Sequence, residues 1–343
     1  MAQTKKELVR AAFNNEPADR VPVGFWLHYT DPSEHNNGLS DPTLFDRNIA
    51  GHKNYYKKFG PDFIKIMSDG FFAYPSEKLA NAKAAADLKG IEPLGGEHPW
   101  IVRQVDLAKA LVKEFGSEVL LFYNIFAPLT YFRFLVEGTG ETADSQKLIA
   151  RLIAEDAGAF KAALDVIGED LSVLVTKIIS EAKADGIYLS VQCTQDASIT
   201  REIYDEVVAP SQLAVLKAAN DAGGENILHI CGYEGLRNHL EWFTSYPAKA
   251  INWAVNVEGV SLAAGKALFG GRAVIGGFDN TAGGILYKGT KAEVEAFTDG
   301  LIRGAGTRGV IIGADCTLPN DTDLERFNWV RAKAAQVSAG HKE

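Results

Sequence analysis

The chain has 343 residues, of which 46% are hydrophobic and 23% charged, and this globular composition suits one large α/β domain or two smaller ones. Its formal charge of −9, with dispersed basic residues, argues against a nucleic-acid surface. The charged N-terminus lacks the apolar core of a signal peptide, no stretch is long enough to span a membrane, and there are three cysteines, so we expect a cytoplasmic protein.

The first predicted element is an amphipathic helix in MAQTKKELVRAAF, and eight short β-branched and aromatic runs follow in alternation with helical patterns. The predicted strands are 21–27, 62–67, 118–126, 186–193, 226–231, 248–255, 272–278 and 309–316. Apolar residues recur at helical spacing in 102–116, 201–221 and 291–306, and the interval 131–185 has room for two or three helices.

This alternation predicts an α/β fold, a (β/α)8 TIM barrel that forms a single domain over residues 1–343 with extra N-terminal and mid-chain helices. A doubly wound sheet would need a glycine-rich phosphate turn after an early strand. No G-x-G-x-x-G sequence occurs there.

In a barrel, functional residues lie at the C-terminal ends of the strands. All three cysteines and one histidine lie at such ends in the second half of the chain: Cys193, His229, Cys231 and Cys316. His229 and Cys231 are two residues apart on one strand and therefore point to the same face. Cys316 can approach the same mouth, because the last strand of a barrel returns beside the first. Two thiolates and an imidazole suit zinc and leave one tetrahedral position open, as in catalytic sites.

A packing interpretation competes with the metal site. A His-x-Cys pair on a buried strand is by itself more often a packing feature, because free cysteine is among the most buried residue types. Cys316, at a second strand end, makes metal binding a comparable alternative. For Cys193 we favour a position in the core.

The sequence resembles the uroporphyrinogen decarboxylase superfamily, which also contains zinc-dependent, corrinoid-linked enzymes such as methylcobalamin:coenzyme M methyltransferase. The matching segments are RVPVGFW, FIKIMSDG, APLT at 127–130, ADGIYLSVQ, HICG and GADCTLPNDTDLE. They extend over nearly the whole chain, so the resemblance implies a barrel throughout.

The decarboxylase branch carries an R-Q-A-G-R-Y segment after the first strand and a histidine in G-H-G-I-x-P near the C-terminus. Here the first segment reads LHYTDPSEHN, without arginine, and GADCTLP places Cys316 at the position of that histidine. Arginine is suited to paired carboxylate recognition, so its absence counts against a substrate with eight carboxylates. Asp69 in IMSDG does match the aspartate that contacts the pyrrole nitrogens in decarboxylases.

The methyltransferase branch carries H-x-C followed far downstream by a single cysteine, which here are His229, Cys231 and Cys316. The resemblance implies that these residues hold Zn²⁺ and that a small thiol takes the open position. The thiolate would then attack the methyl group of a methyl-corrinoid carried by a separate protein. We therefore expect a zinc-dependent methyltransferase whose partners are a corrinoid protein and a small thiol, with no nucleic acid and no membrane; its oligomeric state is open.

Polar residues at other strand ends are candidates for supporting roles. We interpret His28, Asp69 and Asp279 as candidate catalytic residues, and Gln192 and Asn256 as candidate cofactor-binding residues. Asp279 and Asn256 could orient His229 or simply close turns. His28 has an alternative as a loop residue, and Asp69 as a helix or turn cap.

Two other functions stay open at this point. One is a uroporphyrinogen decarboxylase of heme biosynthesis, and the other is a non-catalytic small-molecule or corrinoid-binding member of the superfamily.

Overall fold

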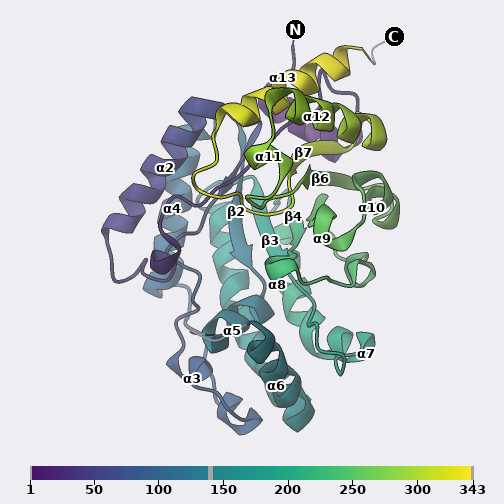
Figure 1. Cartoon of the computed structure of the whole chain (residues 1–343). Coiled ribbons are helices and arrows are strands. Elements are labelled where there is room, and N and C mark those ends of the chain that lie inside the picture. Colours follow the sequence, from purple (N-terminus) through teal and green to yellow (C-terminus); the bar gives the residue numbers. More distant parts are fainter. Residues whose placement is uncertain (1, 138–141, 341–343) are drawn as a thin grey trace.

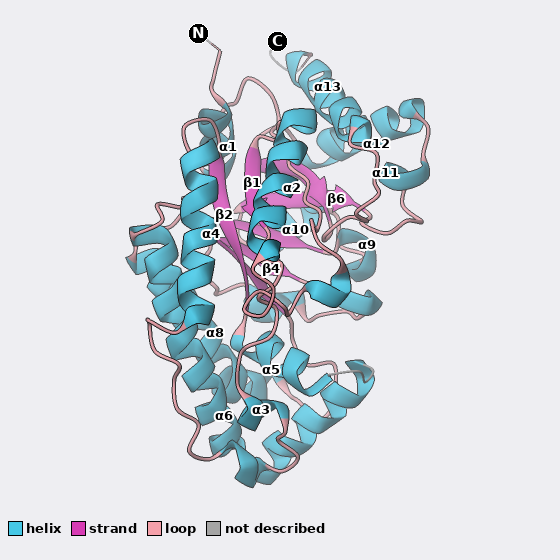
Figure 2. Cartoon of the chain, turned by 90° about the vertical axis from the view of Figure 1, so that its left-hand side faces the viewer, coloured by secondary structure: helices cyan, strands magenta, loops and turns pink. Residues whose placement is uncertain are grey.

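The computed structural model describes residues 2–137 and 142–340. Seven parallel strands form one curled sheet in the order β1 to β7, with helices around its outer face (Figures 1 and 2). The strands are β1 (Phe63–Ile66), β2 (Leu120–Phe126), β3 (Gly186–Val191), β4 (Ile227–Ile230), β5 (Ala250–Trp253), β6 (Ala273–Phe278) and β7 (Val310–Ala314). Each strand pairs with the next along the chain, and all seven lie inside predicted strands. The predicted α/β barrel fold is confirmed.

The helices connect and surround these strands. They are α1 (Lys5–Phe13), α2 (Thr43–Phe59), α3 (Glu77–Ala80), α4 (Pro99–Phe115), α5 (Pro128–Glu137), α6 (Thr142–Ser180), α7 (Arg201–Ile203), α8 (Ala209–Asp221), α9 (Val255–Glu258), α10 (Leu262–Leu268), α11 (Ile285–Lys288), α12 (Lys291–Ala305) and α13 (Glu325–Ala339). In Figure 2, α1 and α13 lie near the two chain ends, whereas α3, α5 and α6 extend at the opposite end of the molecule. None of the helices in the described ranges combines the length and apolar character needed to cross a bilayer.

The first predicted strand, 21–27, is the main difference from the sequence-based prediction. It makes two isolated parallel bridges, Val23 with Ile312 and Leu27 with Leu318, and no continuous ladder. The segment nevertheless lies between the last and the first strand, because the Asp62 N–H donates to the Val23 carbonyl at 3.1 Å. It therefore closes the barrel in the position of an eighth strand.

Part of the backbone of this segment is bonded to side chains, which interrupts the ladder, although the Gly24 N–H and the Pro22 carbonyl still bond to the backbone of Ile312. Pro22 has no N–H to donate. The Val23 N–H donates to Asp62 Oδ2 at 2.7 Å, and the Phe25 carbonyl accepts a hydrogen bond from the Tyr55 hydroxyl. Backbone groups satisfied in this way are not available for regular strand pairing.

The predicted helical interval 131–185 contains the end of α5 and all of α6; residues 138–141 lie outside the described part. Helix α6 is interrupted at Asp156, whose φ of −160° is not helical. The Asp156 Oδ1 accepts the Ala159 N–H at 2.9 Å, so it caps the second half of α6. The predicted helix 201–221 is likewise divided, with a π-helical segment at 204–208 just before Pro210. Pro210 has no N–H for a normal i→i−4 bond, which accounts for the wider turn.

The barrel interior is packed at its N-terminal end. Inward-facing residues from the strands form one buried cluster with α1: Val9, Ala12, Phe13, Trp26, Phe63, Met67, Leu120, Phe122, Tyr188, Ile227, Ala250, Ala273, Ile275 and Ile311. A larger cluster fills the space between the sheet and the outer helices. Because α1 contributes three apolar side chains to the interior cluster, it closes this end of the barrel.

Candidate metal centre

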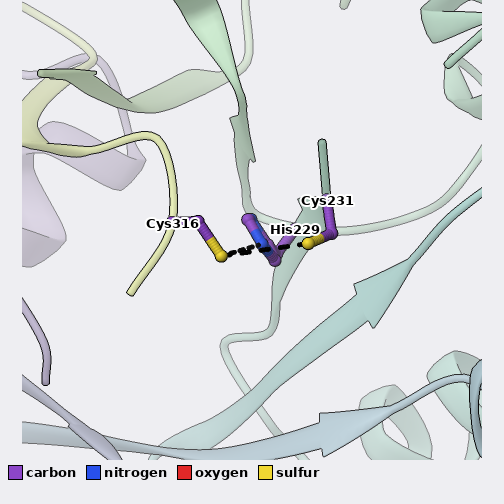
Figure 3. A group of neighbouring side chains, drawn as sticks. All are labelled: His229, Cys231 and Cys316. Carbon is purple, nitrogen blue, oxygen red and sulfur yellow. Dashed lines mark hydrogen bonds between the residues drawn. The ribbon is translucent and has the colours of Figure 1, made fainter. Parts of the chain in front are cut away.

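His229, Cys231 and Cys316 meet at the C-terminal ends of β4 and β7. His229 lies within β4, Cys231 follows that strand directly, and Cys316 lies two residues beyond the end of β7. The Cys231 N–H donates to the Val191 carbonyl at 3.0 Å, which continues the sheet by one residue and keeps Cys231 on the face of His229. Figure 3 shows the three side chains pointing toward one another.

The distances within this triad suit a tetrahedral metal. The two sulfur atoms are 3.8 Å apart, and Cys316 Sγ is 3.5 Å from His229 Nε2. Zinc bonds of ~2.3 Å to sulfur and ~2.1 Å to nitrogen give tetrahedral edges of about 3.8 Å and about 3.6 Å. All three ligand atoms lie within 4.8 Å of one another. The donor set and its spacing therefore fit zinc with three protein ligands.

The pKa values of the two cysteines are shifted in opposite directions. The hydrogen bond from Cys231 to Cys316 holds the pKa of Cys316 well below its usual value and raises the pKa of Cys231. His229 Nε2 also contacts Cys316, which further lowers its pKa. Cys316 therefore carries the first thiolate, and a bound cation would favour the second.

Neighbouring amide groups hold the loops that carry the two cysteines. Asn238 Nδ2 donates to the Cys231 carbonyl at 2.9 Å, and Gln192 Nε2 donates to the same carbonyl at 3.3 Å. On the other side, both the N–H and the Nδ2 of Asn256 donate to Asp315 Oδ2 at 2.8 Å. Asn256 thus fixes the residue before Cys316.

Two predicted supporting residues are not hydrogen-bonded to His229. Asn256 is bound to Asp315, and the Asp279 carboxylate accepts the Thr281 N–H at 2.8 Å within a turn. His229 Nδ1 is buried and has no hydrogen-bond partner among the described residues. Neither Asn256 nor Asp279 is among the residues that line the central cavity.

His28 and Asp69 form a second polar group at the same end of the barrel. His28 Nδ1 lies 2.7 Å from Asp69 Oδ1, and Asp69 Oδ2 accepts the Tyr29 N–H at 2.8 Å. Burial alone would raise the pKa of Asp69, but its contacts with His28 hold that pKa below the usual value. His28, Asp69 and His35 also have metal-ligand spacing. The 2.7 Å separation is a hydrogen-bond length, however, so we describe His28 and Asp69 as a histidine–carboxylate dyad.

A cavity of about 580 Å³ joins these groups. Its lining includes the triad, His28 and Gln192, and much of the wall is apolar: Pro32, Met67, Phe72, Phe126, Phe134, Leu318 and Pro319. Two basic side chains, Lys65 and Arg133, also line the cavity. Arg133 Nη1 donates to the Gln192 Oε1, and Arg133 Nε lies 3.2 Å from the carboxylate of Glu137.

Sequence reasoning missed Lys65 and Arg133. The available signal for Lys65 was its position inside the apolar run DFIKIM, because a lysine in a strand buried on both faces must point into a core or a cavity. Arg133 lies in an ordinary helical pattern, and no local signal separates it from a surface arginine.

Cys193 lies outside the triad, as favoured from the sequence. It is 1% exposed and belongs to the outer core cluster, and its sulfur accepts the His239 N–H at 3.3 Å. Burial raises the pKa of Cys193 to about 12, so its thiol is protonated at neutral pH.

The fold and the site together define an α/β barrel with a histidine–dicysteine centre at the C-terminal ends of its strands. The family described as uroporphyrinogen decarboxylase (URO-D) matches residues 71–336. The chain belongs to this family, which confirms the superfamily recognised from the sequence motifs. A search of curated proteins finds no match.

Two solved structures are similar over nearly their whole length. A methyltransferase from Methanosarcina mazei shares 16% identity with a TM-score of 0.71, and the match covers 97% of this chain and 98% of that one. A B12-independent methionine synthase from Shewanella sp. W3-18-1, in complex with selenomethionine, shares 10% identity with a TM-score of 0.57. That match covers 94% of this chain and 98% of the other. At these identities the similarity supports the fold.

Proposed function

We propose that the protein is a zinc-dependent methyltransferase that moves a methyl group from a methyl-corrinoid, carried by a separate protein, to a small thiol. The observation that carries this proposal is the spacing of His229, Cys231 and Cys316, whose atoms lie close to three corners of a zinc tetrahedron. The cavity beside the triad leaves room for an acceptor at the fourth corner.

Bound zinc would be held by these three residues and would supply the Lewis acidity that keeps a thiol sulfur deprotonated at neutral pH. In the proposed reaction, His28 accepts the thiol proton at Nε2, because its Nδ1 is engaged by Asp69. The new sulfur–methyl bond then forms as the methyl–cobalt bond breaks, and the electron pair of that bond stays with the corrinoid. The phenylalanine side chains of the wall exclude water from the thiolate.

The cavity also bears on the decarboxylase alternative. A substrate with eight carboxylates would need several basic side chains to bind it. Of the lysine and arginine side chains in the described residues, two line this cavity, Lys65 and Arg133. Arg133 is already paired with Glu137. The geometry therefore favours methyl transfer over decarboxylation of a porphyrinogen.

The test combines metal analysis with a methyl-transfer assay. We expect about one zinc per chain and transfer of the methyl group from methylcobalamin to coenzyme M or homocysteine. Cys316→Ala should lose both zinc and transfer, because it removes one of three ligands. Cys193→Ala serves as the matched control and should keep both, since Cys193 lies in the outer core.

Two results would contradict the proposal. Formation of coproporphyrinogen from uroporphyrinogen by metal-free protein would establish the decarboxylase. X-ray absorption that shows no new sulfur ligand after thiol addition would instead support a non-catalytic binding protein.

A further inference from the structure

Lys65 is a buried cation below the metal centre. It lies in β1, and the residues two before and two after it, Phe63 and Met67, both belong to the interior cluster. Alternate residues of a strand share a face, so the Lys65 side chain also points into the barrel. It is 5% exposed and lines the same cavity as His229 and the two cysteines.

The immediate neighbours of the Lys65 ammonium group are aromatic rings. Its Nζ lies 4.5 Å from the ring centroid of Tyr188 and 5.2 Å from that of Trp26. Within residues 2–137 and 142–340, no carboxylate forms an ion pair with it. Cation–π contacts offset only part of the cost of burying an ammonium group, so this charge needs a further reason to lie inside the barrel.

The negative groups that act on Lys65 are the sulfur atoms of Cys316 and Cys231 and, more weakly, the Asp69 carboxylate, which is already engaged by His28 and the Tyr29 N–H. Burial lowers the pKa of Lys65 to about 8, while the charges of Cys316 and Cys231 act in the opposite direction. The lysine is therefore within electrostatic reach of the metal centre. Arg133, the other cation of the cavity, is engaged by Glu137 and Gln192.

The net charge of the proposed zinc site indicates which bound state the Lys65 ammonium group would stabilise. Zn²⁺ and two cysteine thiolates sum to zero, and His229 is a neutral ligand. An incoming thiolate brings one uncompensated negative charge into a cavity with mostly apolar walls. The Lys65 ammonium group restores neutrality in that state. Methylation converts the thiolate into a neutral thioether, which Lys65 no longer attracts.

We propose that Lys65 is a positioning residue whose ammonium group holds the acceptor as a thiolate, and that loss of this attraction favours release of the methylated product. The inference rests on the proposed function. It adds a residue outside the metal triad that favours a charged thiolate over a neutral ligand. It predicts that Lys65 distinguishes a thiol from its methyl thioether.

The test compares ligand binding to the zinc-loaded protein by calorimetry between pH 6 and pH 9. The probes are 2-mercaptoethanol and 2-(methylthio)ethanol, which differ in the ionisable sulfur. Lys65→Met removes the charge at similar length, and Lys65→Arg keeps a charge. Lys217→Met removes a lysine that is 72% exposed on α8 and serves as the control.

We expect Lys65→Met to weaken thiol binding on the order of ten- to hundredfold and to shift the pH of half-maximal binding upward by about one to two units. Thioether binding and zinc content should not change. Lys65→Arg should retain most of the thiol affinity, and Lys217→Met should behave as the native protein.

Several results would overturn the inference. Equal thiol affinity in Lys65→Met, equal losses for thiol and thioether, or loss of zinc would each show that Lys65 does not select the thiolate. A native zinc protein that binds no thiol at all would reject the proposed function as well. If Lys65→Met does not fold, as judged by circular dichroism, Lys65→Gln provides the same comparison.

Discussion

At the scale of single residues, a substitution in the His28–Asp69 dyad should change the rate of catalysis without changing metal binding. We predict that Asp69→Asn lowers the rate of methyl transfer about a hundredfold or more, because an amide no longer fixes the ring for proton transfer. Zinc content should stay the same, since Asp69 is not a ligand of the triad. Rate measurements across pH, together with metal analysis, check both expectations.

A comparison with His28→Gln tests whether the two residues act as one unit. If they do, the double variant is no slower than the slower single variant. Additive losses would show that Asp69 acts independently of His28.

The residue-scale features differ in how well they could be predicted from the sequence. The grouping of the histidine–dicysteine triad was predictable because strand alternation brings His229 and Cys231 to one face and family motifs add Cys316. For Asn256 the sequence left two roles open, orienting His229 or closing a turn, and its side chain binds Asp315. Such a choice depends on loop conformations that residue spacing does not determine.

At the scale of elements, α2 is attached to the end of β1 by two buried side chains. The His52 Nδ1–H donates to the Asn48 carbonyl at 2.9 Å, while His52 Nε2 accepts the Met67 N–H at 3.1 Å. Asn48 Nδ2 donates to the Met67 carbonyl at 2.9 Å. This arrangement requires neutral His52, and burial lowers its pKa to about 4.

The attachment predicts a loss of stability in acid. Unfolded His52 has its ordinary pKa of 6.5, so the unfolded chain binds a proton before the native protein does. The free energy of unfolding should therefore fall by about 3 kcal/mol as the pH decreases from 6.5 to 4, and this contribution is constant below that range.

Urea denaturation at several pH values measures the free energy of unfolding of the native protein and of His52→Gln, and so tests this pH dependence. Glutamine keeps an acceptor for the Met67 N–H but does not titrate. An equally steep pH dependence in the variant would assign the effect to other groups.

Element boundaries were the less predictable part of the fold. All seven regular strands lie within predicted runs, because parallel strands covered on both faces are apolar throughout. The segment 21–27 has the same apolar pattern, but its backbone is bonded to Asp62 and Tyr55. Those partners are distant in the sequence, so no local pattern indicates the interruption.

At the scale of the whole molecule, closure of the barrel depends on Asp62. Its carboxylate is fully buried, binds Arg20 through two hydrogen bonds of 2.6 Å, and accepts the Val23 N–H. We predict that Asp62→Ala lowers the free energy of unfolding by about 3–5 kcal/mol, because it leaves a half-buried guanidinium group and a backbone donor without partners.

Equilibrium denaturation measures this change. Asp205→Ala is the control, since it removes an exposed ion pair with Arg201 and should cost less than about 1 kcal/mol. Similar losses in the two variants would show that Asp62 does not close the barrel.

Helix α1 has a consequence for the proposed reaction that concerns kinetic order. It fills the N-terminal end of the barrel with Val9, Ala12 and Phe13, and the cavity lies at the other end. A small acceptor and a protein-borne donor must then arrive from the same side. If the proposed function holds, a donor protein docked over this mouth would cover the way in, so we expect the acceptor to enter first and the methylated product to leave after the donor. For the proposed reaction, the packed end of the barrel therefore predicts an ordered sequence of binding and release.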